Sequence, residues 1–386
     1  MGRFRDALAA PGLGAIAEIK RRSPSAGDLR PSADPARLAA DFAGAGAAAI
    51  SVLVDERFGG SLDDLRAARA ATSAPLLAKG FFTEEPQLRE LREAGADAAL
   101  LLLRDVDDSR AASLLASAAA AGLELLVEAH DAAELDRALA LRAEVIGVNA
   151  RDLVTFEIDR ETQLRLVASV ADRETVVVAE SGVHSRAQGA AAELAGADAI
   201  LVGSALMRAG DPAVKLAELL SRPLVKVCGL TRQEDVDAAA EAGADLLGFI
   251  FAEGSPRRAD AVLDVAPDRL SVAVFVGDAE TTDADLVQLY EREPGRVRGR
   301  DAVLQRDGRT VARVVDLPWE EQDAGHLRRA VSAEGRIVLA GRLGPDNVQA
   351  AVHAVRPWAV DAASRLEASP GIKDPDKVRA FVAAAR

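Results

Sequence analysis

Side chains suited to acid–base chemistry recur at intervals through the first 204 residues of the sequence. Each of them ends or follows a short apolar run, and together they are Glu18, Lys20, Lys79, Glu128, Asn149, Glu180, Ser181, Gly203 and Ser204. A positioned acid can protonate a carbonyl oxygen, and a positioned base can take up a proton and return it to a departing hydroxyl group. The set therefore predicts proton-transfer catalysis, provided that folding brings these side chains together.

The apolar runs themselves are typical of buried strands. Between them lie stretches such as SLDDLRAARAA, in which apolar residues recur at the three- and four-residue steps of an amphipathic helix. Strands that alternate with helices form right-handed βαβ units and a parallel sheet, and eight such units close into a (β/α)8 barrel with its chemistry at the carboxyl ends of the strands. The eight runs are AIAEIK, AISVLV, PLLAK, ALLLL, ELLVEA, VIGVN, VVVAE and AILVG.

The alternation restarts after residue 222, where Pro223 precedes a new series of eight runs. We therefore predict an α/β protein of two fused (β/α)8 TIM barrels, over residues 1–222 and 223–386. The second barrel must be compressed, because it is shorter than the ~200 residues at the small end of the fold. Its middle leaves no room for a helix between DAVLQ and TVARVVD, and QRDGR there favours a hairpin turn.

Composition excludes several classes of function. A net charge of −14 and 3% aromatic residues argue against a nucleic-acid surface. No apolar stretch has membrane length, and the first residues lack a signal-peptide core. A single cysteine is typical of the reducing cytoplasm, and the four histidines lack metal-ligand spacing, so we expect a cytoplasmic enzyme without metal or cofactor.

Six segments of the first half, read in order, carry a family resemblance. IAEIKRRSPSAGDL, SVLVDERFGGSLDDL, LVEAH, IGVNARDL, AESGVHS and LVGSALMRAGDP resemble indole-3-glycerol-phosphate synthase over nearly all of residues 15–220. The resemblance implies that Lys79 is the general acid and Glu128 the general base. It implies substrate contacts from Glu18 and Lys20, which share one face of a strand, and from a further set: Phe81, Asn149, Arg151, Glu180 and Ser181.

Phosphate binding is expected at the last two loops of this barrel. Ser181-Gly182 and Gly203-Ser204 supply small residues there, so backbone N–H groups can approach an anion. The polar loop RRSPSAGDLRPSADP could close over substrate as a lid. Gly80 departs from the family pattern, in which an aspartate follows the catalytic lysine.

The second half resembles phosphoribosylanthranilate isomerase at both of its ends. The opening segment is LVKVCGLTRQEDVDAAAEAGADLLGFIFAEGSPR, and the closing segments are LAGRLGPDNV and PGIKDPDKVRAFV. The resemblance implies that Cys228 is the base and that Arg257 holds the anthranilate carboxylate. By the order of the runs, Asp316 is the acid.

Three departures affect this second site. Tyr290 stands where the family has a histidine, and Arg342 and Arg365 stand where it has glycines around the phosphate. The arginine side chains either block the anion or replace the backbone amides as its ligands. The sequence does not decide between these two outcomes.

Three hypotheses for the whole chain remain open at this point. The first is a bifunctional enzyme of tryptophan biosynthesis that acts on small phosphosugar–anthranilate substrates, with no nucleic-acid or membrane partner and a monomer as the working expectation. The second is a synthase whose carboxyl-terminal half is a silent packing or interaction module. The third is another phosphosugar barrel enzyme, such as an aminoaldose isomerase, which would turn over substrates lacking anthranilate.

Overall fold

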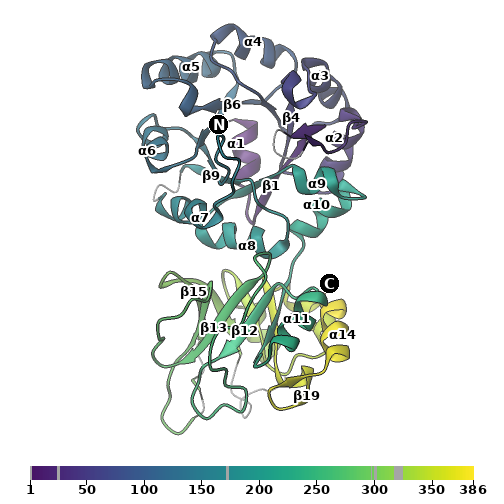
Figure 1. Ribbon diagram of the computed structural model, residues 1–386, viewed down its shortest axis with the longest axis vertical. Helices are drawn as coiled ribbons and strands as arrows, with labels where there is room; N and C mark the ends of the chain where they lie inside the picture. Colours follow the sequence, from purple (N-terminus) through teal and green to yellow (C-terminus); the bar gives the residue numbers. More distant parts are fainter. Residues whose placement is uncertain (1, 24–26, 171–173, 297, 300–301, 317–324) are drawn as a thin grey trace. The chain divides into compact units, whose positions relative to one another are not determined.

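Eight parallel strands close a barrel in the first 220 residues of the computed structural model, as the eight apolar runs predicted (Figure 1). The model describes residues 2–23, 27–170, 174–296, 298–299, 302–316 and 325–386. The ring closes where β1 pairs with β10 on one side and β4 on the other. The strands are β1 (Gly14–Ile19), β4 (Ala49–Leu53), β5 (Leu76–Lys79), β6 (Ala98–Leu102), β7 (Glu124–Ala129), β8 (Val145–Asn149), β9 (Val176–Glu180) and β10 (Ala199–Val202).

Helices connect these strands, and their first turns carry the expected capping residues. Asp34 accepts backbone N–H bonds at the start of α2, and Ser61 and Asp64 form a capping box in α3. Figure 1 shows α2 to α7 around the strands. The helices are α2 (Pro35–Gly44), α3 (Leu62–Ala71), α4 (Glu85–Glu93), α5 (Asp108–Ala120), α6 (Ala132–Ala140), α7 (Arg160–Ser169), α8 (Arg186–Ala195), α9 (Ser204–Arg208) and α10 (Pro212–Leu220).

The short helix α1 (Arg3–Leu8) closes the amino-terminal end of this barrel. Its Phe4 and Leu8 are fully buried and pack with the apolar side chains of the strands. The backbone N–H groups of Phe4 and Arg5 donate to the carboxylate of Glu124, which begins β7. Helix α1 therefore closes the end of the barrel at which the strands begin. The polar side chains at the carboxyl ends of the strands lie at the opposite end.

A second barrel of eight strands follows, with one strand reversed. β15 pairs antiparallel with both of its neighbours, whereas the other pairs in the ring are parallel. Asp307 and Gly308 form the turn between β15 and β16 with φ of 48° and 75°, so the hairpin predicted at QRDGR is confirmed. The strands are β11 (Leu224–Cys228), β12 (Leu246–Ile250), β13 (Leu270–Val276), β14 (Leu286–Tyr290), β15 (Ala302–Arg306), β16 (Arg309–Val315), β17 (Ile337–Leu339) and β18 (Ala359–Ala362).

Helices are fewer in the second barrel, which explains how it fits into a short length of chain. Between β12 and β16, the described residues contain no helix. A core of buried apolar residues joins the strands to the helices that remain. These helices are α11 (Gln233–Glu241), α12 (His326–Val331), α13 (Val348–Val355) and α14 (Pro375–Ala385).

The chain divides into two units between Leu220 and Ser221, and residues 185–187 group with the second unit. Small two-stranded ribbons lie outside the rings. They are β2 (Arg22–Ser23) with β3 (Gly27–Asp28), and β19 (Glu367–Ser369) with β20 (Ile372–Lys373). Part of the segment predicted to act as a lid, residues 24–26, lies outside the described residues, so the lid stays a prediction. No helix among the described residues is long and apolar enough to cross a membrane.

Candidate active site

The carboxyl ends of the strands in the first unit surround a cavity of about 570 Å³. Its wall includes the predicted acid on β5 and the predicted base on β7, together with side chains from β1 and β8. Eleven of the twelve residues predicted for this site line the cavity: Glu18, Lys20, Lys79, Phe81, Glu128, Asn149, Arg151, Ser181, Gly182, Gly203 and Ser204. The twelfth, Glu180, lies beneath the cavity floor with its side chain 1% exposed.

Lys79 is surrounded by three carboxylates. Its Nζ donates a hydrogen bond to Glu180 Oε2 at 2.5 Å, and it lies 3.4 Å from Glu128 Oε2 and 3.9 Å from Glu18 Oε1. Glu18, Glu128 and Glu180 are buried, and Lys79 is partly buried with its side chain 14% exposed. The ammonium group therefore occupies the centre of the cluster and faces the cavity.

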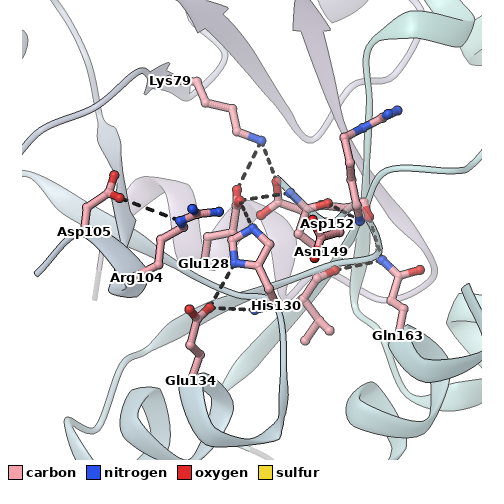
Figure 2. A network of polar contacts seen from close by, with 12 residues as sticks. Lys79, Arg104, Asp105, Glu128, His130, Glu134, Asn149, Asp152 and Gln163 are labelled. Carbon is pink, nitrogen blue, oxygen red and sulfur yellow. Dashed lines mark hydrogen bonds and ion pairs between the residues drawn. The ribbon is translucent and has the colours of Figure 1, made fainter. Parts of the chain in front are cut away.

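Glu128 is held from two further sides, as Figure 2 shows. Asn149 Nδ2 donates to Glu128 Oε1 at 2.9 Å, and His130 Nε2 lies 3.1 Å from the same oxygen. His130 Nδ1 in turn lies 2.9 Å from Glu134 Oε2 on α6. The predicted base is thus connected to β5, β8 and α6 at once.

The same contacts set the protonation states of the cluster. Burial favours neutral Lys79, but Glu180, Glu128 and Glu18 outweigh it and raise the pKa of Lys79. Burial likewise opposes ionisation of Glu128, yet Lys79 and His130 lower the pKa of Glu128. Glu180 has less compensation, and burial together with the charge of Glu128 raises the pKa of Glu180 to about 8. Burial and the charge of Glu128 thus favour the neutral form of Glu180, whereas Lys79 and His130 favour the ionised form of Glu128.

Two glycines allow the carboxylates to approach so closely. A Cβ atom at Gly147 would lie 2.0 Å from Glu180 Oε1, and one at Gly203 would lie 2.1 Å from Glu18 Oε2. Any larger residue at either position would displace a carboxylate of the cluster. Gly147 was not singled out in the sequence, where it reads as an ordinary strand residue.

The rim of the cavity contains the predicted substrate contacts. Lys20 Nζ lies 2.6 Å from Glu18 Oε2, which places the two side chains on one face as expected. The guanidinium of Arg57 lies 4.0 Å from the ring centroid of Phe81, and Phe58 stacks on that ring. This apolar and cationic wall suits a flat aromatic acid.

Sequence reasoning missed His130 and Glu134 at this site. A usable signal existed, because His130 follows Glu128 by two residues, and alternate residues of a strand share a face. Glu134, four residues later, lies in the first turn of α6.

A second cavity, of about 630 Å³, lies at the carboxyl ends of the strands in the second unit. The predicted base and acid of the isomerase, Cys228 and Asp316, both line it, as do Arg257 and Arg342. Arg365 is not among its lining residues. The guanidinium of Arg365 instead lies 2.9 Å from Asp346 and donates to the backbone carbonyl of Arg342 at 3.1 Å.

Buried polar side chains connect the strands below this cavity. Lys226 Nζ donates to Asp361 Oδ2 and to Gln288 Oε1, each at 2.7 Å. Gln288 Nε2 donates to the hydroxyl of Tyr290 at 2.9 Å, and that hydroxyl donates to Asp316 Oδ2 at 2.6 Å. Tyr290, which replaces the family's histidine, therefore holds the predicted acid directly.

Two further contacts affect the predicted isomerase residues. Arg298 donates to Asp316 Oδ1 at 2.8 Å, and Arg257 makes a two-pronged ion pair with Glu367 at 2.8 and 2.9 Å. Burial raises the pKa of Asp316 despite Arg298, and burial also raises the pKa of the Cys228 thiol. At this site the proposed acid is favoured in its neutral form and the proposed base is a thiol.

Among the described residues, no group of three or more His, Cys, Asp and Glu side chains is arranged to hold a metal ion. In the first cavity Lys79 forms ion pairs with carboxylates, and in the second Arg298 forms one with Asp316. The fold and these two cavities define a two-barrel α/β protein with a polar cavity at the carboxyl ends of the strands in each barrel.

Comparison with known proteins narrows this class. The family described as indole-3-glycerol phosphate synthase matches residues 2–219, and the family described as N-(5'phosphoribosyl)anthranilate (PRA) isomerase matches residues 320–384. The indole-3-glycerol phosphate synthase of Mycobacterium ulcerans is 49% identical over 216 residues, which are 56% of this chain and 79% of that protein. Indole-3-glycerol phosphate synthase 2 of Streptomyces coelicolor is 50% identical over 218 residues, 56% of this chain and 84% of that protein.

Among solved structures, phosphoribosyl anthranilate isomerase from Thermus thermophilus is 29% identical over 42% of this chain and 97% of its own, with a TM-score of 0.34. The chain belongs to the indole-3-glycerol phosphate synthase family. Its first unit has that activity in tryptophan biosynthesis, and its second unit carries a PRA isomerase domain.

Proposed function

We propose that the chain catalyses two consecutive steps, with isomerisation in residues 223–386 and indole formation in residues 1–222. The isomerase would convert N-(5-phosphoribosyl)anthranilate into 1-(2-carboxyphenylamino)-1-deoxyribulose 5-phosphate. The synthase would close that ketose to indole-3-glycerol phosphate. We place the enzyme in the cytoplasm as a monomer that acts on these small substrates, without nucleic-acid or membrane partners.

The observation that carries the synthase mechanism is Lys79 among three carboxylates beside the cavity. Lys79 donates its proton to the ketone oxygen while the aromatic carbon that bears the carboxylate attacks the carbonyl carbon. Carbon dioxide then leaves, which restores the aromatic ring. Glu128 takes a proton from the neighbouring methylene group and returns it to the hydroxyl, which departs as water. Because the carboxylate leaves as neutral carbon dioxide, the reaction consumes one proton, which Lys79 regains from solvent.

The cavity wall supplies the groups that such a substrate needs. Arg151 and Lys20 offer positive charge to the anthranilate carboxylate, and Asn149 orients Glu128. Ser181-Gly182 and Gly203-Ser204 expose backbone to the cavity at its phosphate end. Ser181 and Gly182 have φ of 70° and 73°, a conformation that turns successive N–H groups toward an anion.

Substitution of Glu128 by Gln tests the base. The amide retains the shape of the side chain but cannot accept the proton, so we expect indole formation to fall by at least ~10²-fold. Isomerisation by the second unit should continue at the wild-type rate. Glu90, exposed on α4, offers the matched control: Glu90→Gln should leave both rates unchanged. A near-normal synthase rate in Glu128→Gln would refute the assignment.

For the isomerase, we propose Asp316 as the acid and Cys228 as the base. Asp316 protonates the ring oxygen of the aminoribose, and the ring opens to an iminium ion. Cys228 then removes the proton from the adjacent carbon, and the resulting enol rearranges to the ketone. Both side chains line the same cavity, which supports these roles, and Arg257 and Arg342, which also line it, would bind the carboxylate and the phosphate.

Cys228→Ser tests this second site. We expect isomerase activity to disappear while synthase activity on the supplied ketose remains, because the substitution changes one atom of a buried side chain. Loss of both activities would indicate misfolding, whereas an unchanged isomerase rate would refute the base assignment.

One observation favours a silent second barrel as the alternative. Arg298 and Tyr290 both donate to the Asp316 carboxylate, and these two donors oppose the neutral form that burial favours. A protein that converts the ketose but not the ribosylamine would establish this alternative.

A further inference from the structure

His130 contacts a carboxylate through each of its ring nitrogens. Nε2 lies 3.1 Å from Glu128 Oε1 in the catalytic cluster, and Nδ1 lies 2.9 Å from Glu134 Oε2. The backbone N–H of His130 also donates to Glu134 Oε2, at 2.9 Å. Figure 2 shows the imidazole between the two carboxylates, with Glu134 on the side away from Lys79.

The two carboxylates favour the protonated form of the ring. A neutral imidazole has one N–H group and one lone pair, so it would turn a lone pair toward one of the two carboxylates. The imidazolium ion instead attracts both: Nδ1 meets Glu134 in hydrogen-bond geometry, and the contact of Nε2 with Glu128 is a close ion pair without that geometry. Its side chain is 14% exposed and that of Glu128 is 2% exposed, so solvent screens their contact weakly.

We propose that His130, held by Glu134, is a positioning residue that keeps Glu128 oriented and ionised while Lys79 is without its proton. This inference rests on the proposed role of Glu128 as the base. It assigns His130 and Glu134 to the synthase reaction, although neither group touches the substrate.

The need for such a residue follows from the proposed chemistry. Lys79 is the other close cation beside Glu128, and it gives up its positive charge when it protonates the ketone. Without a second cation, the ionised form of the buried Glu128 would then lose its main stabilisation. Glu128 would take up a proton before it could act as the base. The imidazolium retains its charge through this step.

The charged groups around His130 agree with this role. Glu134 faces it from α6, and Glu128 is on its own strand. Lys79 from β5, Glu180 from β9 and the neutral Asn149 from β8 contact Glu128 from other sides. Burial lowers the basicity of the ring, but the two carboxylates outweigh it and raise the pKa of His130 to about 9. The ring therefore stays protonated over the range in which the synthase would work.

Two substitutions in the full-length protein test the inference. His130→Gln removes the charge but keeps an amide that can donate, and Glu134→Gln removes the partner that holds the imidazolium. We expect kcat of the synthase to fall about 10- to 30-fold in the first variant and less in the second, with KM within about twofold, since outer partners of a reactive group typically contribute 10–100-fold. His353→Gln, exposed on α13, is the control and should match the wild type.

The pH profile and nuclear magnetic resonance separate this role from simple packing. The acidic limb of kcat should move to higher pH in both variants, because Glu128 becomes easier to protonate. An alkaline limb near pH 9, where His130 loses its proton, should be absent from His130→Gln. In protein labelled at histidine, the resonance lost in His130→Gln should titrate near pH 9 in the wild type and at lower pH in Glu134→Gln.

The outcomes are distinguishable from failure of the underlying mechanism. If Glu128→Gln is inactive but His130→Gln keeps the wild-type rate and pH profile, the inference is wrong. An ordinary titration of His130 near pH 6.5 would also overturn it. If Glu128→Gln keeps its activity, the base assignment fails instead. Should His130→Gln not fold, the kinetics and resonance shift of Glu134→Gln decide.

Discussion

Replacement of Lys79 by Met removes the cation at the centre of the catalytic cluster and keeps most of the volume of the side chain. Three carboxylates that are 5%, 2% and 1% exposed then lose their common counter-ion. Removal of one partner of a buried ion pair typically destabilises a protein by about 3–5 kcal/mol. Because burial and the charge of Glu128 favour the neutral form of Glu180, we expect the lower end, about 3 kcal/mol.

The loss of stability in Lys79→Met should be larger at high pH than at low pH. Without Lys79, the pKa of Glu128 in the folded state rises from its lowered wild-type value, so the stability that ionised Glu128 contributes shrinks and the deficit of the variant grows as pH rises. For a unit of this size, about 3 kcal/mol corresponds to roughly 6–12 °C in melting temperature. We expect that decrease at pH 8 and less than half of it at pH 5.

The distribution of tryptophan makes the assay specific. Both tryptophans, Trp319 and Trp358, belong to the second half of the sequence, so tryptophan fluorescence follows that half while circular dichroism follows both. Lys79→Met should lower the temperature of an unfolding transition seen by circular dichroism. It should leave the temperature of the transition seen by fluorescence unchanged.

A second-site substitution tests the protonation states directly. At pH 7, Lys79→Met with Glu128→Gln should regain about half of the lost stability, because the amide replaces an ionised group. Lys79→Met with Glu180→Gln should regain little, since burial and the charge of Glu128 already favour the neutral form of Glu180. Equal rescue by both, or a melting temperature of Lys79→Met that does not change with pH, would refute the electrostatic account.

Three further predictions concern single groups. Burial raises the pKa of Cys228, the one cysteine, so iodoacetamide should alkylate it slowly at pH 8 and faster above pH 9. Alkylation at pH 8 as fast as that of an exposed thiol would contradict the raised pKa. Arg342→Gly should weaken inhibition of the isomerase by inorganic phosphate about tenfold. Arg365→Gly should change this inhibition less than twofold, because the Arg365 guanidinium is paired with Asp346. Stronger inhibition in Arg342→Gly would show that the arginine obstructs the anion. The pKa of His130 in the folded state, about 9, exceeds its unfolded value, so the wild type should be more stable than His130→Gln at low pH. This difference, about 1 kcal/mol or 2–4 °C in melting temperature, should be full below about pH 6.5 and vanish as pH rises through 9. A difference that grows with pH would contradict the assignment.

Much of the first barrel was predictable because its strands are buried on both faces. Such strands appear in sequence as continuous apolar runs, and their first polar residues fall where a parallel barrel places its chemistry. Lys79 and Glu128 are 49 positions apart in the chain, yet they lie at ends of strands that the fold brings together. Residue type, run length and order were sufficient to place them in one cavity.

The second barrel shows where this reasoning stops. The Asp307-Gly308 turn was visible, but no periodicity states that β15 runs against both of its neighbours. The direction of Arg365 depends on Asp346, 19 positions earlier, and that of Arg257 depends on Glu367, 110 positions later. Sequence patterns describe neighbours along the chain, so contacts between distant loops stay beyond them.

The most direct test of the account gives purified full-length protein N-(5-phosphoribosyl)anthranilate as its only substrate. Fluorescence of the anthranilate group and absorbance of the indole are followed together. We predict that the fluorescence of the starting material changes first and that indole-3-glycerol phosphate then accumulates, because one chain carries both centres. Failure to form indole from this substrate would contradict the claim that one chain carries both centres, and failure with the ketose supplied directly would contradict the synthase assignment as well.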